Sequence, residues 1–170
     1  MSMVEAQLVS SKKQDWETPE KLFQRLDSEF GFDLDAASDG KNAKCELFLT
    51  EEDDALSVPW RVGDVRTVFC NPPYGRGIGR WVEKAFREAE DNGLTVVLLI
   101  FARTDTSWWH DYVMKAATIR FIRGRLTFEV DGEPAASPAP APSCVVVFKP
   151  TYTLEEFRRP THITTMERPK

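Results

Sequence analysis

The chain has 170 residues and a formal net charge of −5 at pH 7, the size of one domain able to bury a core. A modestly acidic chain is not a general polyanion binder, and no apolar run reaches membrane-spanning length. The three cysteines, Cys45, Cys70 and Cys144, are odd in number and lie in apolar runs. We therefore expect reduced thiols and a cytoplasmic location. With only His110 and His162 as histidines, we expect no metal site.

Charge is unevenly distributed along the chain. Ten acids lie between Asp27 and Asp54 against two lysines, whereas residues 101–126 carry five cations and two acids. An acidic half suits a cationic small molecule, and a basic segment suits phosphate. Taken alone, such runs more often mark ordinary solvated surface.

The elements predicted from the pattern begin after a flexible N-terminal tail at residues 1–14. A helix is predicted to begin at Pro19, with Thr18 as its N-cap, and to end before Gly31. The further predicted elements are strand 32–37, strand 45–50, strand 67–70, helix 80–93, strand 95–101, helix 106–117, strand 118–122, strand 125–130 and strand 143–148. The Pro/Ala-rich segment 133–142 is predicted to be a loop. Residues 151–170 are treated as a C-terminal tail.

This order predicts an α/β fold with a mostly parallel sheet, covered by helices and ending in an antiparallel edge hairpin. Residues 15–150 are expected to form a single domain. The strands predicted at 32–37 and 45–50 are separated by seven residues. A full crossover helix needs roughly ten or more residues. Either this helix is shortened or one of the two strands is misassigned.

The stretch Asn71-Pro72-Pro73-Tyr74 directly follows the strand predicted at 67–70. Both prolines lack an N–H and have a fixed φ, and a proline also holds the residue before it in extended geometry. The Asn71 side-chain oxygen and the Pro72 carbonyl can then point the same way, as two acceptors for one NH₂ group. Tyr74 supplies a ring that can stack on a flat partner. The structural alternative is a Pro-Pro turn with a half-buried tyrosine.

A flat ring that carries an NH₂ group, such as adenine, fits this arrangement. Two acceptors on the exocyclic amine would localise its lone pair and aim it at an electrophilic methyl group. The end of a strand in an open α/β sheet is where ligands bind. A base inside a duplex cannot reach such a site and must be flipped out.

NPPY is also the catalytic motif of amino-group methyltransferases that use S-adenosylmethionine (AdoMet). Together with DWETPEKLF, LDAAS, NAKC, DDALSVPW, RTDTSWWH and FIRGRLTF in that order, it resembles the phage-type DNA N6-adenine methyltransferases, the small Dam-like family of phages and prophages. The resemblance runs from roughly Asp15 to Phe148. It implies a Rossmann-like fold, AdoMet as cofactor, double-stranded DNA as partner and a bacterial host cytoplasm as location. It also implies direct in-line transfer to N6 and protection of phage DNA from restriction.

The resemblance implies residue roles as well. The catalytic set is Asn71, Pro72, Pro73 and Tyr74. The cofactor-binding set is Trp16, Thr18, Pro19, Asp35, Ala36, Asp54 and, for the ribose hydroxyls, Glu51 or Glu52. The chain departs from the family pattern because its cofactor loop is poor in glycine. It also shows no separate target-recognition domain.

Four arginines are candidates for DNA phosphate contacts: Arg76, Arg103, Arg123 and Arg125. A surface role unrelated to DNA is the alternative for each. Thr104 and Asp105 are expected to line the cleft or to cap a helix. Core packing is expected for Trp108 and Trp109, and the alternative for one of the two is a stacking or wedge residue. Gly77 and Gly79 are expected to let the loop after Tyr74 move. The alternative functions are methylation of an RNA base or a protein glutamine, and a non-catalytic module that binds nucleic acid or AdoMet.

Overall fold

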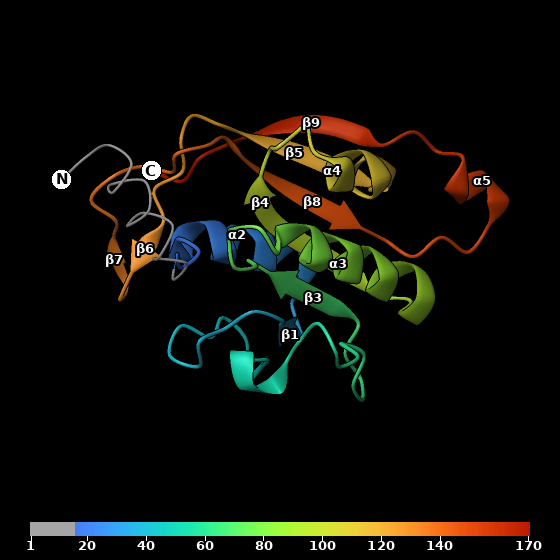
Figure 1. Cartoon of the computed structure of the whole chain (residues 1–170), viewed down its shortest axis with the longest axis horizontal. Coiled ribbons are helices and arrows are strands. Elements are labelled where there is room, and N and C mark those ends of the chain that lie inside the picture. Colours follow the sequence, from blue (N-terminus) through green and yellow to red (C-terminus); the bar gives the residue numbers. More distant parts are fainter. Residues whose placement is uncertain (1–15) are drawn as a thin grey trace.

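The structure is a computed structural model that describes residues 16–170, apart from the side chain of Phe157. The tail predicted at residues 1–14 lies outside the described residues. A seven-stranded sheet runs through the molecule in the order β2-β1-β3-β4-β8-β5-β9 (Figure 1). Its strands are β1 (Leu34–Asp35), β2 (Leu47–Phe48), β3 (Thr67–Cys70), β4 (Thr95–Phe101), β5 (Thr118–Arg123), β8 (Ser143–Phe148) and β9 (His162–Glu167).

The sheet is mostly parallel, which confirms the predicted α/β class. β8 pairs antiparallel with both β4 and β5, whereas β9 pairs parallel with β5. The antiparallel strand therefore lies inside the sheet, and the prediction of an antiparallel hairpin at its edge is wrong. Every residue of β8 is buried, which suits a strand covered on both faces. The edge beside β5 is formed by β9, from the segment treated as a tail.

Two hydrophobic clusters cover the opposite faces of this sheet. Along β4, Val97, Leu99 and Phe101 belong to one cluster, and Val96, Leu98 and Ile100 belong to the other. This alternation follows the two-residue period of a strand. Helix α2 (Glu20–Phe30) adds Leu22, Phe23 and Leu26 to the first cluster, and α3 (Ile78–Asn92) adds Val82, Ala85 and Ala89 to the second. The sheet is thus buried on both faces.

The predicted helices are present but their boundaries differ. Pro19, not Thr18, is the N-cap of α2, because the Pro19 carbonyl accepts hydrogen bonds from the Leu22 and Phe23 N–H groups, each at 3.0 Å. The helix predicted at 106–117 is split into α4 (Ser107–Asp111) and the 3₁₀ helix η2 (Val113–Lys115). The remaining helices are η1 (Glu51–Asp53) and α5 (Leu154–Phe157).

A small hairpin separate from the main sheet stands at the end of the molecule opposite α5 (Figure 1). It consists of β6 (Glu129–Val130) and β7 (Glu133–Pro134), so the strand predicted at 125–130 is shorter than expected. β7 lies at the start of the segment predicted to be a loop. The turn between the two strands contains Asp131 (φ 53°) and Gly132 (φ 77°).

No helix connects β1 to β2, although these strands are parallel neighbours. The connecting loop, residues 36–46, is held by its own side chains. Asp39 Oδ1 accepts hydrogen bonds from Lys41 N at 2.7 Å and Asn42 N at 2.8 Å. Asn42 Oδ1 accepts in turn from Asp39 N and Ser38 Oγ, each at 3.1 Å. A strand of two residues therefore lies within each of the two predicted ranges, and the crossover helix is replaced by a hydrogen-bonded loop.

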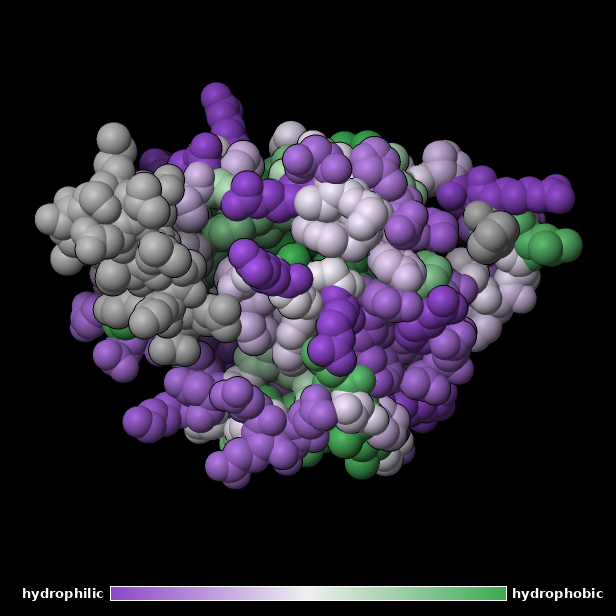
Figure 2. All heavy atoms as spheres, viewed as in Figure 1, coloured by the Kyte–Doolittle hydropathy of each residue, from purple (hydrophilic) through white to green (hydrophobic). Residues whose placement is uncertain are grey.

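The face in Figure 2 is largely hydrophilic among the described residues. Apolar side chains are exposed near α5, where Tyr152 and Leu154 are each 75% exposed. Within residues 16–170, none of the helices combines the length and the apolar composition needed to cross a membrane.

Candidate active site

Two cavities are associated with the segment that follows β3. Cavity A, of about 390 Å³, is lined by Asn71 and Pro73, and cavity B, of about 550 Å³, is lined by Tyr74 and Gly75. Trp16 lines both cavities. Volumes of this size are typical of small-molecule sites. The NPPY segment and Trp16 therefore adjoin two separate spaces.

Cavity A is built at the carboxyl ends of β1, β2 and β3. Asp35 and Ala36 come from the end of β1, Glu51 follows β2, and Asn71 follows β3. The cavity is acidic, since five acids line it against a single lysine, Lys44: Glu17, Asp35, Asp39, Glu51 and Asp54. Such a cavity favours a cationic ligand that also presents hydroxyl groups.

Asp35 is the most buried of these acids, with 3% of its surface exposed. Its Oδ1 accepts a hydrogen bond from Ala37 N at 3.2 Å, and its Oδ2 accepts one from Lys44 N at 3.0 Å. Burial raises the pKa of Asp35, and these two hydrogen bonds oppose the rise. Asp35 thus caps the loop at 36–46 and also lines cavity A.

The acids at 51–54 have different environments. Asp53 closes the turn of η1, where hydrogen bonds from Thr50 N and Thr50 Oγ1 lower its pKa. Asp54 adopts a left-handed conformation and accepts from Ser57 Oγ at 2.5 Å. Glu51 lines cavity A, and Glu52 does not. Of the two acids expected at the ribose, only Glu51 lines the cavity.

Within the described residues, the Asn71 side-chain amide is hydrogen-bonded through its nitrogen and not through its oxygen. Its Nδ2 donates a hydrogen bond to the Trp16 carbonyl at 2.7 Å. Its Oδ1 is buried and has no hydrogen-bond partner within the described part of the chain. A buried acceptor left unpaired costs roughly 1–3 kcal/mol, so a donor that reached Asn71 Oδ1 would be bound favourably.

Tyr74 has its hydroxyl inside the fold. Because β4 extends past β3, which ends with Cys70 opposite Leu98, the Leu99 carbonyl lies beyond that pairing. The Tyr74 hydroxyl donates to this carbonyl at 2.9 Å, and burial raises the pKa of Tyr74 well above its usual range. The phenol therefore stays neutral, and its ring lines cavity B.

Cavity B has four aromatic residues in its lining. The Tyr74 ring centroid lies 4.3 Å from that of Phe101 and 5.9 Å from that of Trp16, and Trp108 completes the aromatic lining. Residues of the loop after β7, among them Ala135, also line it. Aromatic walls suit a planar ring. Trp109, in contrast, is a core residue that is 3% exposed.

The segment before α2 places the remaining predicted cofactor residues. Trp16 and Thr18 line cavity A, and Thr18 is 2% exposed. Pro19 is buried but does not line the cavity; it holds the N-cap position of α2. Six of the seven cofactor residues in the predicted set (Trp16, Thr18, Asp35, Ala36, Glu51 and Asp54) therefore meet in one cavity.

The four arginines are all exposed, but only Arg103 lines a cavity. It follows β4 at the mouth of cavity B, with its guanidinium 5.9 Å from the Phe101 ring centroid. Arg123 ends β5, which runs in the same direction as β4, so both residues lie at the carboxyl edge of the sheet. Arg123 Nη1 is 3.5 Å from Glu167 Oε1. Arg76 and Arg125 line neither cavity.

Three further expectations are wrong in detail. Thr104 and Asp105 are exposed and line neither cavity; the Thr104 carbonyl lies 2.9 Å from His110 Nε2. Gly79 is not in a mobile loop but in α3, where an added Cβ would meet Trp108 Cδ1 at 3.0 Å. Its lack of a side chain permits close helix packing.

Sequence patterns missed several lining residues. Asn42, Lys44 and Trp81 line cavity A, and Phe101 and the loop after β7 line cavity B. Phe101 was predictable as the last residue of a strand ending at the site edge. The loop gave no signal beyond its Pro/Ala composition. Across residues 16–170, His, Cys, Asp and Glu side chains form no group of three able to hold a metal ion.

The mostly parallel sheet, with one internal antiparallel strand and ligand-sized cavities at the carboxyl ends of its strands, defines an α/β protein with a Rossmann-like methyltransferase fold. The chain belongs to the DNA N-6-adenine-methyltransferase (Dam) family, which matches residues 5–169.

Two phage proteins named DNA N-6-adenine-methyltransferase are similar to the chain. The protein of Escherichia phage T1 is 35% identical over 118 residues, covering 69% of this chain and 48% of the phage protein. The protein of Haemophilus phage HP1 is 30% identical over 122 residues, covering 71% of this chain and 68% of the phage protein. The chain thus spans about half the length of the phage T1 relative.

Proposed function

We propose that this protein transfers a methyl group from AdoMet to the N6 amine of an adenine in double-stranded DNA. The observation that carries the proposal is the buried, unpartnered Oδ1 of Asn71 at the wall of cavity A. Family membership supports the same reaction. An NH₂ group is the donor that this oxygen lacks.

Cavity A suits AdoMet in size and in charge. When bound, AdoMet supplies a methyl group carried on a sulfonium cation. Asp35, Glu51 and Asp54 offer carboxylates to its positive and hydroxyl groups, and Trp16, Thr18 and Ala36 form the adjoining walls. Pro19 acts indirectly, by starting α2 immediately after Thr18.

The two acceptors for the adenine amine are Asn71 Oδ1 and the Pro72 carbonyl. No donor to the Pro72 carbonyl is found among residues 16–170, although Pro72 is buried and lines neither cavity, so its role as the second acceptor rests on its place between Asn71 and Tyr74. Pro72 and Pro73 fix the backbone between the amide and the ring. With both N–H bonds held, the lone pair on N6 points outward. As N6 gains the methyl group it becomes cationic and loses one proton to water.

Cavity B is the site proposed for the flipped adenine, with its ring against Tyr74 and its amine directed toward Asn71, which lines the neighbouring cavity A. The aromatic lining favours a base over the non-aromatic amide of a protein glutamine. Arg76, Arg103, Arg123 and Arg125 are proposed to contact DNA phosphates. Rate enhancement comes mainly from positioning and from the two acceptors. The setting is the cytoplasm of a bacterial host, where methylation protects phage DNA from restriction.

Modified-base sequencing of a methylation-free bacterial host that expresses the chain tests this proposal. Wild type should yield N6-methyladenine in a defined sequence context, and Asn71→Ala should yield none. The matched control is Asn92→Ala, which also removes a side-chain amide but at the end of α3 and away from both cavities. This variant should methylate normally. In parallel, purified protein is offered unmethylated DNA, RNA and glutamine-containing peptides with labelled AdoMet.

Full transfer by Asn71→Ala would overturn the mechanism. Labelling of RNA or peptide in preference to DNA would overturn the substrate. Calorimetry with AdoMet alone separates binding from chemistry: wild type and Asn71→Ala should both bind. No heat of binding with wild type would favour a non-catalytic module.

A further inference from the structure

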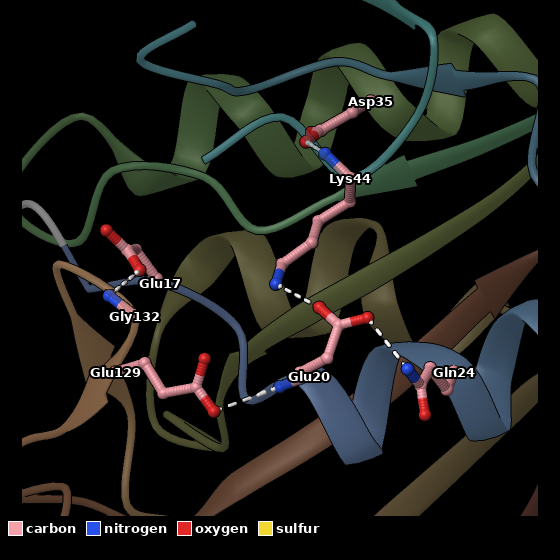
Figure 3. Close-up of polar contacts among 7 residues, drawn as sticks. All are labelled: Glu17, Glu20, Gln24, Asp35, Lys44, Glu129 and Gly132. Atoms are coloured by element: carbon pink, nitrogen blue, oxygen red, sulfur yellow. Dashed lines mark hydrogen bonds and ion pairs between the residues drawn. The ribbon is translucent and has the colours of Figure 1, made fainter. Parts of the chain in front are cut away.

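The segment Trp16–Thr18 is docked on the β6–β7 hairpin by its backbone and by one side chain. Glu17 and Glu129 exchange two backbone hydrogen bonds, each of 3.0 Å. The Glu17 carboxylate then accepts from Asp131 N at 3.2 Å and from Gly132 N at 3.0 Å, as Figure 3 shows for Gly132. The Glu17 carboxylate therefore binds the turn of the hairpin.

The acceptor for the turn comes from outside the hairpin. Asp131 and Gly132 both have positive φ, at 53° and 77°, and both are exposed. The two N–H groups converge on a single carboxylate, an arrangement suited to an anionic acceptor. No other residue described in the structure accepts a hydrogen bond from either group. The contact thus stabilises a backbone conformation that is rare for an aspartate, and it links the turn to the segment before α2.

A second contact fixes the hairpin to the start of α2. Glu129 Oε1 accepts from Glu20 N at 3.1 Å, and Glu20 Oε2 is 2.8 Å from Lys44 Nζ (Figure 3). Lys44 N donates in turn to Asp35 in cavity A. The hairpin is therefore joined by polar contacts to the cofactor cavity, while the loop after β7 forms a wall of cavity B.

The position of Trp16 decides the orientation of the Asn71 amide. Rotating a side-chain amide by 180° exchanges the positions of its oxygen and its nitrogen. A fixed hydrogen-bond partner at one of these positions selects the orientation of the amide. Here the Trp16 carbonyl, one residue from Glu17, accepts from Nδ2 and leaves Oδ1 unpartnered. If Trp16 moves, this selection is lost.

We propose that Glu17 is a positioning residue for methyl transfer: by holding the hairpin turn, it fixes the Trp16 carbonyl, and that carbonyl holds Asn71 Oδ1 ready for the substrate amine. The kinetic consequence rests on the proposed function. The geometric consequence does not, because it concerns the protein alone. Glu17 also lines cavity A, so a direct effect on AdoMet binding has to be measured separately.

The geometric test is the side-chain amide signal of Asn71 in ¹⁵N–¹H spectra of the protein alone, assigned by its absence in Asn71→Asp. In wild type we expect slow solvent exchange, because Nδ2 is hydrogen-bonded. In Glu17→Ala the signal should shift and exchange faster, with a smaller change in Glu17→Gln, which keeps one acceptor oxygen. Glu133→Ala, an acid on the same hairpin that lines neither cavity, is the control and should leave the signal unchanged.

The kinetic test is a double-mutant cycle. Glu17→Ala should lower kcat on the order of tenfold, and in an Asn71→Ala background it should lower the residual rate far less, because the amide that it positions is gone. An unmoved Asn71 signal in both Glu17 variants would overturn the inference, even if AdoMet affinity fell. If Glu17→Ala fails to fold, Glu17→Gln alone decides. If wild type does not methylate DNA, the proposed function fails, and the spectra still decide the role of Glu17.

Discussion

Asp35 combines two demands that oppose each other. It is nearly fully buried, and burial raises its pKa, yet it holds two backbone N–H groups of the loop at 36–46. The ionised form suits these hydrogen bonds and a cationic ligand, whereas the neutral form suits burial. The protein therefore keeps an acid in cavity A whose charge costs folding free energy.

This cost predicts a pH dependence of stability. An aspartate has a pKa of about 3.9 in an unfolded chain, and the value in the fold is higher. Between the two values the folded state binds more protons, so the contribution of Asp35 to stability is greatest below the unfolded pKa. It declines as pH rises through the folded pKa. We expect the unfolding free energy of wild type, minus that of Asp35→Asn, to fall as pH rises through this window and then to level off.

Urea unfolding of both proteins over acidic to neutral pH measures this difference. Subtraction removes the titration of all other acids, provided that these are unchanged. A difference that rises with pH would mean that hydrogen bonding outweighs burial and that the pKa of Asp35 is lowered.

At the level of elements, strong apolar runs were predicted to the residue and short strands were not. β3, β4 and β8 match the predicted ranges because continuous β-branched and leucine runs leave no alternative. β9 was not predicted because its sequence, HITTME, is mostly polar and only Met166 is buried. Its strand geometry comes from pairing with β5, which the local sequence does not encode.

The residues of the candidate site likewise include some that the sequence predicts and some that it does not. Residues in the ordered motifs lie around cavity A because the carboxyl ends of parallel strands meet at one edge. Contacts across the chain, such as Trp16 with Asn71, left no pattern in the sequence because they join residues far apart along it. The same holds for the hairpin contacts of Glu17.

The loop between β1 and β2 offers an element-scale prediction. Its shape depends on Asn42, whose Oδ1 accepts from Asp39 N and Ser38 Oγ, and all three residues line cavity A. Asn42→Ala should weaken AdoMet binding roughly tenfold, or about 1.4 kcal/mol. The unfolding free energy should change by less than about 1 kcal/mol, because the loop adds little to the core.

Calorimetry with AdoMet and urea unfolding check these two expectations. Lys41→Ala, an exposed truncation in the same loop, is the control and should bind normally. Unchanged affinity in Asn42→Ala would show that the loop keeps its shape without these side-chain hydrogen bonds. A loss of stability as large as the loss of affinity would assign Asn42 to the core fold instead.

Across the whole molecule, the charges are arranged against general DNA binding. The net charge is −5, and the lining of cavity A includes five acids and one lysine. Under the proposed function, the attraction of DNA therefore has to be local, from exposed cations at the carboxyl ends of the strands. Arg103 and Arg123 lie at these ends, and Arg103 is also at the mouth of cavity B. The neighbouring Glu167 offsets part of the charge of Arg123.

Arg103 is therefore the cation whose removal should most clearly change DNA binding. Each phosphate contact adds about 0.9 to the steepness of the dependence of log affinity on log salt for B-form DNA. Arg103→Ala should reduce that slope by about one contact, measured by fluorescence anisotropy with a labelled duplex between about 50 and 200 mM salt. Arg66→Ala removes the same charge before β3, at the opposite edge of the sheet, and should leave the slope unchanged. Equal slopes for wild type and Arg103→Ala would mean that DNA approaches the molecule by another face.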